Sequence, residues 1–258
     1  MTPGRLDRGL VCCLDGVGGY NWGPRWLRGG LLDAGVACAI TIFDWGYGPK
    51  GMFIADLVAE EKNKRRAAEL AAMVENYERL FPGRPVYLIG HSAGAGMVVF
   101  ALEQMADETR VDDVFLLAPA LDPERNLAPA LRHVRSRCFA TYSPADVALM
   151  GLGTSVFATL DRKHTLGAGL VGFKLPQALS PEDGHQYRKL RQAGWDTALL
   201  KKGLWGGHMG WSSPRFACEY IAPVLRGDEA PAIFQPLATL PSESTVGEGT
   251  TAQGESEQ

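Results

Sequence analysis

The sequence predicts an α/β protein in which a mostly parallel sheet of about six strands carries helices on both faces. Short apolar runs typical of buried strands alternate with longer segments whose apolar residues recur at helical spacing. The segments that join them have the lengths that are common in α/β folds. With 258 residues, the chain can bury one large core.

In the first part of the chain, apolar segments that end at glycine or proline predict two strands and two helices. Residues 10–16 (LVCCLDG) predict a strand that leads into a glycine-rich loop. Residues 26–35 predict a helix, and residues 37–46 predict the second strand. A long amphipathic helix follows and ends at Pro82. Its apolar positions recur at helical spacing and are Ala67, Leu70, Ala71, Val74, Tyr77 and Phe81.

Residues 90–94 read Gly-His-Ser-Ala-Gly and stand between a strand pattern at 85–89 and an apolar helix pattern at 95–105. A strand, G-x-S-x-G and a helix in this order predict a nucleophile elbow, a tight turn that presents a serine hydroxyl. The glycines suit such a strained turn and the close packing of the helix on the strand. Ser92 is therefore the candidate nucleophile.

The second part of the chain continues the alternation. Residues 111–121 and 137–146 each predict a strand, residues 195–208 contain the last one, and residues 214–226 predict the closing helix. The intervening segment is rich in glycine and longer than a plain helical connection. We expect a lid or pocket-wall segment within 147–194.

Residues 1–226 are thus expected to form one domain. From residue 227 to residue 258 the composition shifts to Pro, Ser, Thr, Glu and Gly, which predicts a disordered tail.

The bulk composition excludes several function classes. The formal net charge is −3, so nothing predicts a nucleic-acid partner, and no apolar stretch approaches the length of a membrane span. The five cysteines are scattered through apolar runs, which predicts reduced core thiols and no metal site. The N-terminal apolar run is short for a signal peptide, so a cytoplasmic protein is expected.

A serine nucleophile needs a base, and His208 is the candidate. It follows the predicted last strand and precedes the closing helix, at the sheet edge where ligand sites of open α/β sheets form. The other four histidines are expected to be solvated or packed rings, and these are His91, His133, His164 and His185. The side chain of His91 should point away from that of Ser92.

The base in turn needs a carboxylate that orients it. Asp146, at the end of the strand predicted in 137–146, is the candidate, and Asp122, which follows the preceding strand, is its rival. Less well placed are Asp161, Asp183 and Asp196.

An oxyanion hole is the third requirement of this chemistry. The backbone N–H of Ala93, directly after the serine, is one expected donor. The second is expected from the glycine-rich loop after the first strand, with Val17 preferred and Gly16 next. No metal or organic cofactor is needed.

From residue 10 to about residue 226 the chain resembles the α/β-hydrolase superfamily in its compact form, and the most specific matches are GHSAG, SPAD and GGHMG. The resemblance implies the same roles for Ser92, Asp146 and His208, as nucleophile, acid and base. Two features depart from the superfamily pattern. Asp15 stands where many members have a histidine in the oxyanion loop, and no opening antiparallel hairpin is evident.

The sequence thus predicts a serine hydrolase that cleaves a small-molecule carboxylic ester through an acyl-enzyme. Two alternatives stay open. The same triad could serve an acyltransferase or thioesterase, or the fold could bind a ligand without catalysis. Six aromatic residues near the predicted loops are candidates to line an apolar pocket: Tyr20, Trp22, Trp45, Tyr47, Trp205 and Trp211.

Overall fold

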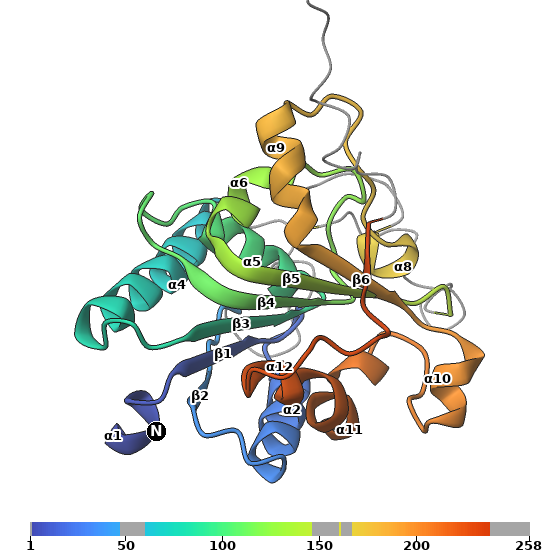
Figure 1. Cartoon of the computed structure of the whole chain (residues 1–258), viewed down its shortest axis with the longest axis horizontal. Coiled ribbons are helices and arrows are strands. Elements are labelled where there is room, and N and C mark those ends of the chain that lie inside the picture. The colour runs from blue at the N-terminus through green and yellow to red at the C-terminus, as the bar shows by residue number, and fades with distance from the viewer. Residues whose placement is uncertain (1, 47–59, 146–159, 161–166, 238–258) are drawn as a thin grey trace, which may run out of the picture.

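The computed structural model describes residues 2–46, 60–145, 160 and 167–237. These residues form a seven-stranded sheet with the strand order β2-β1-β3-β4-β5-β6-β7, which Figure 1 shows nearly edge-on. Neighbouring strands run parallel except β6 and β7, which are antiparallel. The strands are β1 (Leu10–Leu14), β2 (Ala39–Ile42), β3 (Val86–His91), β4 (Val111–Leu117), β5 (Val134–Tyr142), β6 (Leu190–Gly194) and β7 (Gln235–Pro236).

Helices cover both faces of the sheet, so the predicted fold class is confirmed (Figure 1). Every residue of β1 and of β3 is buried, as expected for central strands of a sheet covered on both sides. One face carries α4 (Glu60–Leu80), α5 (Ala93–Leu102), α6 (Ala128–Arg132), α8 (Ala168–Val171) and α9 (Pro181–Gln186). The other carries α2 (Trp22–Asp33), α10 (Thr197–Lys201), α11 (Pro214–Phe216) and α12 (Ala222–Leu225).

The last parallel strand differs from its prediction. The structure places it at β6 (Leu190–Gly194), whereas the segment 195–208, predicted to contain it, holds helix α10. Asp196 caps this helix, because its carboxylate accepts a hydrogen bond of 3.0 Å from the Leu199 N–H. The prediction of a strand within 195–208 is therefore wrong, and a short apolar run after an N-cap residue is helical instead.

The folded chain extends past residue 226, the predicted domain boundary. Phe234 is buried, with its ring centroid 4.7 Å from that of Phe139 on β5, and β7 pairs with β6 directly after it. This aromatic anchor holds the start of the predicted tail on the sheet. Residues 238–258 lie outside the described part of the chain.

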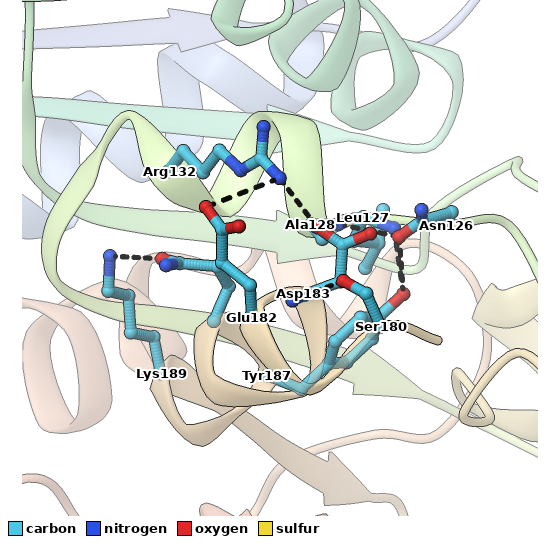
Figure 2. Close-up of polar contacts among 10 residues, drawn as sticks. Asn126, Leu127, Ala128, Arg132, Ser180, Glu182, Asp183, Tyr187 and Lys189 are labelled. Carbon is cyan, nitrogen blue, oxygen red and sulfur yellow. Dashed lines mark hydrogen bonds and ion pairs between the residues drawn. The ribbon is translucent and has the colours of Figure 1, made fainter. Parts of the chain in front are cut away.

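The segment predicted to hold a lid, 147–194, is described from residue 167 onward and at residue 160. Its described part includes α9, which docks on α6 through the polar contacts of Figure 2. Arg132 of α6 binds the Asp183 carboxylate at 2.7 Å, and the buried Tyr187 hydroxyl accepts the Leu127 N–H at 2.8 Å. These contacts make α9 part of the scaffold. The predicted lid otherwise falls outside the described residues.

The cysteines are free thiols, and all but Cys218 are buried. Burial raises the pKa of Cys13 and of Cys138 to about 12. Such thiols stay protonated near neutral pH and behave as small apolar core residues.

Across the described ranges, none of the helices combines the length and the hydropathy that crossing a membrane requires.

Candidate active site

Ser92 stands at the turn between β3 and α5 in a strained backbone conformation. Its φ is 55° and its ψ is −122°, a region that residues with a side chain rarely adopt. Three backbone hydrogen bonds hold it there. Its N–H donates to the Leu117 carbonyl at 2.8 Å, and its own carbonyl accepts the N–H groups of Ala95 and Ala120, each at 3.1 Å. The strand-turn-helix predicted around residues 90–94 is therefore present.

The glycines on either side of Ser92 are required because other backbone atoms lie too close to leave room for a side chain. A Cβ on Gly90 would lie 2.5 Å from the Cα of Ala95, so a side chain there would separate α5 from β3. A Cβ on Gly94 would collide with the backbone carbonyl of Asp15, in the loop after β1. The elbow is thus packed directly against the loop that was predicted to complete the oxyanion hole.

Gly16 of this loop lies beside the serine side chain. A Cβ on Gly16 would lie 3.1 Å from the Ser92 Cβ and 3.5 Å from its Oγ. The loop is anchored by the buried Trp45, whose indole N–H donates to the Asp15 carbonyl at 2.8 Å. Val17 and Ala93, the predicted oxyanion donors, directly follow Gly16 and Ser92 in sequence. Their convergence on one substrate oxygen stays a prediction.

Gly16→Ala should impair turnover more than stability. The added methyl group would press on the Ser92 Cβ and shift the loop or the serine slightly, and a misplacement of about 1 Å at a reacting centre can cost about 10²-fold in rate. We expect kcat/KM for an ester to fall about 10- to 100-fold with little change in Tm. The matched control is Gly29→Ala on α2, where an added Cβ meets nothing within 4 Å. Equal kcat/KM values for the two variants would show that Gly16 does not border the reacting centre.

His208 lies in the loop between α10 and α11, and two contacts fix this loop beside the elbow. The His208 carbonyl oxygen lies 2.8 Å from Nε2 of His91, the residue before the serine, and the two imidazole centroids are 4.7 Å apart. The Gly207 N–H donates to the Ser143 hydroxyl at 3.4 Å. Ser143 follows β5 and is fully buried. The structure therefore brings the predicted base to the end of β3 that carries Ser92.

Asp146, the predicted acid, lies outside the described residues. Its neighbour Ser143, in the same Ser-Pro-Ala-Asp segment, is the residue that contacts the His208 loop. The rival Asp122 is buried in the turn after β4, where its carboxylate accepts the Glu124 N–H at 3.2 Å. That contact gives Asp122 a turn-forming role of its own.

The histidines and aspartates that were not preferred as site candidates lie in structural contacts or at the surface where they are described. His133 is buried between α6 and β5, with Nδ1 3.0 Å from the Thr109 carbonyl, and His185 is exposed on α9. Asp183 pairs with Arg132, and Asp196 caps α10. His164 and Asp161 lie outside the described part of the chain.

His91 is the residue whose contact with the site was not predicted. The sequence predicts only that its side chain points away from the serine's. In the structure it is 2% exposed, and its Nδ1 lies 3.8 Å from the Asp15 carboxylate. No local sequence signal indicates this contact, because it depends on where the His208 loop returns in the fold.

The aromatic candidates for a pocket divide into two groups. Trp45 and Trp211 are buried and serve as core anchors. Trp22 stacks on Tyr20 at a centroid distance of 4.9 Å and is exposed, and Trp205 in the His208 loop is 76% exposed. Tyr47 falls among the residues that are not described. Within the described ranges, no cluster of three or more His, Cys, Asp or Glu side chains could hold a metal ion.

The parallel sheet with a serine elbow at the end of β3 defines an α/β hydrolase. The family model described as "Alpha/beta hydrolase of unknown function (DUF900)" matches residues 30–168, more than half of the chain. The protein belongs to this family.

The fold is similar to solved structures of low sequence identity. A predicted CIB-like hydrolase from Thermoplasma acidophilum is 15% identical, with a TM-score of 0.45, over 88% of this chain and 89% of that one. Est1E from Butyrivibrio proteoclasticus is 13% identical, with a TM-score of 0.49, over 85% and 87%. A cutinase-like protein from Cryptococcus sp. is 14% identical, with a TM-score of 0.46, over 86% and 97%. A search of curated proteins found no match.

Proposed function

We propose that this protein is a serine hydrolase that cleaves carboxylic esters of small molecules through an acyl-enzyme, with Ser92 as nucleophile, His208 as base and Asp146 as the acid that orients it. The observation that carries the proposal is the strained conformation of Ser92 at the end of β3 beside the anchored His208 loop. Backbone strain held by surrounding hydrogen bonds is typical of functional positions. The free thiols support a cytoplasmic location as part of this proposal.

In the proposed reaction, Ser92 Oγ attacks the ester carbonyl carbon while its proton passes to His208. The N–H groups of Ala93 and Val17 donate to the oxyanion that forms. The C–O bond then breaks, and the alcohol leaves with the proton from His208. Water next gives a proton to His208 and attacks the acyl carbon. The bond between that carbon and Ser92 Oγ then breaks, Oγ takes the proton back from His208, and the carboxylic acid leaves.

A panel of p-nitrophenyl esters from acetate to decanoate tests the proposal. We expect release of p-nitrophenol that saturates with substrate, with an initial burst where deacylation is the slow step. The Ser92→Ala variant measured in parallel gives the background. Rates equal to that background for every ester in the panel would contradict the proposal.

The same panel separates the alternative chemistries. Thioesters with the same acyl chains test for a thioesterase, and added alcohol acceptors test for acyl transfer. A higher kcat/KM for the oxygen ester than for the matched thioester, with water as the acceptor, is the result that ester hydrolysis predicts. A higher kcat/KM for the thioester would identify the protein as a thioesterase that uses the same serine.

A further inference from the structure

His91 is a buried polar side chain inside the nucleophile elbow, and the reaction described above does not use it. It is the last residue of β3 and directly precedes Ser92. Its ring is 2% exposed, so it is almost completely removed from water. An unpaired polar group costs free energy in the interior, and Nδ1 of this ring has no hydrogen-bond partner among the described residues, so the bond made by Nε2 fixes the ring.

The partner of Nε2 is the backbone of the predicted catalytic base. The His208 carbonyl oxygen lies 2.8 Å from His91 Nε2, and a carbonyl can only accept, so Nε2 carries the proton and donates it. The two rings lie next to each other, with centroids 4.7 Å apart. His91 thus holds the main chain of the residue whose side chain must reach Ser92.

The other edge of the ring faces the oxyanion loop. Nδ1 lies 3.8 Å from the Asp15 Oδ1, and a Cβ on Gly16 would be 3.8 Å from the same nitrogen. One side chain therefore contacts the loop after β1 and the His208 loop, and it belongs to the elbow itself. These are the three segments that carry the proposed donors, base and nucleophile.

We propose that His91 is a positioning residue, whose Nε2–H bond to the His208 carbonyl sets the base at the distance that Ser92 requires. The inference rests on the proposed function, because it assigns a partner to the proposed base. Catalytic groups must be held closely, and a shift of about 1 Å can cost about 10²-fold in rate. Loss of the bond should therefore lower kcat more than it raises KM.

The test compares two substitutions at this position. His91→Phe keeps a planar ring of similar size and removes the donor, whereas His91→Gln keeps an N–H donor at about the reach of Nε2. We expect kcat for the best ester of the panel to fall about 10- to 100-fold in His91→Phe, with KM within about 3-fold of the wild-type value. His91→Gln should recover most of the lost kcat. If His91→Phe does not fold, His91→Met supplies a flexible side chain without a donor.

His133→Phe is the matched control. His133 is also a buried histidine, and its Nδ1 lies 3.0 Å from the Thr109 carbonyl. It directly precedes Val134, where β5 begins, and so lies at the end of that strand opposite to Tyr142. A purely structural role for both histidines predicts that the two variants lose stability alike and keep kcat. The positioning role predicts that only His91→Phe loses kcat in its folded state.

Amide hydrogen exchange supplies a readout that does not depend on activity. Residues 203–210 should exchange about 10-fold faster in His91→Phe than in the wild type, and at the wild-type rate in His133→Phe. Unchanged exchange in this loop, or equal kcat for the His91→Phe and His133→Phe variants of an active enzyme, would overturn the inference. An inactive wild-type protein would instead refute the proposed function, and the exchange measurement would still decide whether His91 holds the loop.

Discussion

Ser92→Ala is expected to lower kcat for ester hydrolysis by about 10⁴-fold or more, because no covalent intermediate can form without the hydroxyl. The residual rate would come from substrate binding and the oxyanion donors alone. The fold should be unaffected, since the bonds that hold the turn are made by the backbone of Ser92 with Leu117, Ala95 and Ala120. Steady-state kinetics and the thermal midpoint of the purified variant measure both quantities.

The matched control for this substitution is Ser136→Ala on β5, an exposed residue whose hydroxyl hydrogen-bonds the Asp113 carboxylate. It should retain the wild-type kcat. Retention of kcat by folded Ser92→Ala would remove the covalent mechanism, whatever the identity of the best substrate.

Asp146→Asn is expected to lower kcat by about 10⁴-fold with little change in KM. An asparagine of the same shape cannot hold the histidine in the tautomer that accepts the serine proton, nor stabilise the imidazolium that forms. The neighbourhood supports this role, because the Ser143 hydroxyl of the same segment accepts the Gly207 N–H next to His208.

Asp122→Asn distinguishes the two acids. The Asp122 carboxylate accepts the Glu124 N–H, and the amide oxygen of asparagine can accept the same bond, so kcat should change less than about 3-fold. A fall of about 10⁴-fold in this variant instead of in Asp146→Asn would transfer the role of the acid to Asp122.

The fold could be predicted largely because its strands are covered on both faces. The apolar runs at β1, β3 and β4 are too short for a typical helix, and Gly or Pro stands near their ends, so each run predicts a buried strand. The last strand could not be located this way. In β6, Leu190 and Ala193 are buried, but polar residues separate them, whereas the apolar residues after the Asp196 cap belong to α10. Burial near a sheet edge gives a weaker pattern than burial at its centre.

In the candidate site, too, the local features could be predicted and the contacts between distant segments could not. Ser92 was predictable because its turn requires glycine where backbones meet, and this requirement is local in sequence. The approach of the His208 loop to the elbow could be expected only from the order of strands. No sequence pattern indicates the bond between His91 and the His208 carbonyl, because only the folded chain brings these two positions together.

Labelling with a fluorophosphonate is the most direct test of the central claim, that Ser92 is a nucleophile activated by His208. Folded wild-type protein should be modified once, with the phosphonyl group on Ser92 in the peptide mass spectrum, and His208→Ala should slow this modification by orders of magnitude. Wild-type protein that remains unlabelled while folded, or that is labelled at the same rate without His208, would contradict the account.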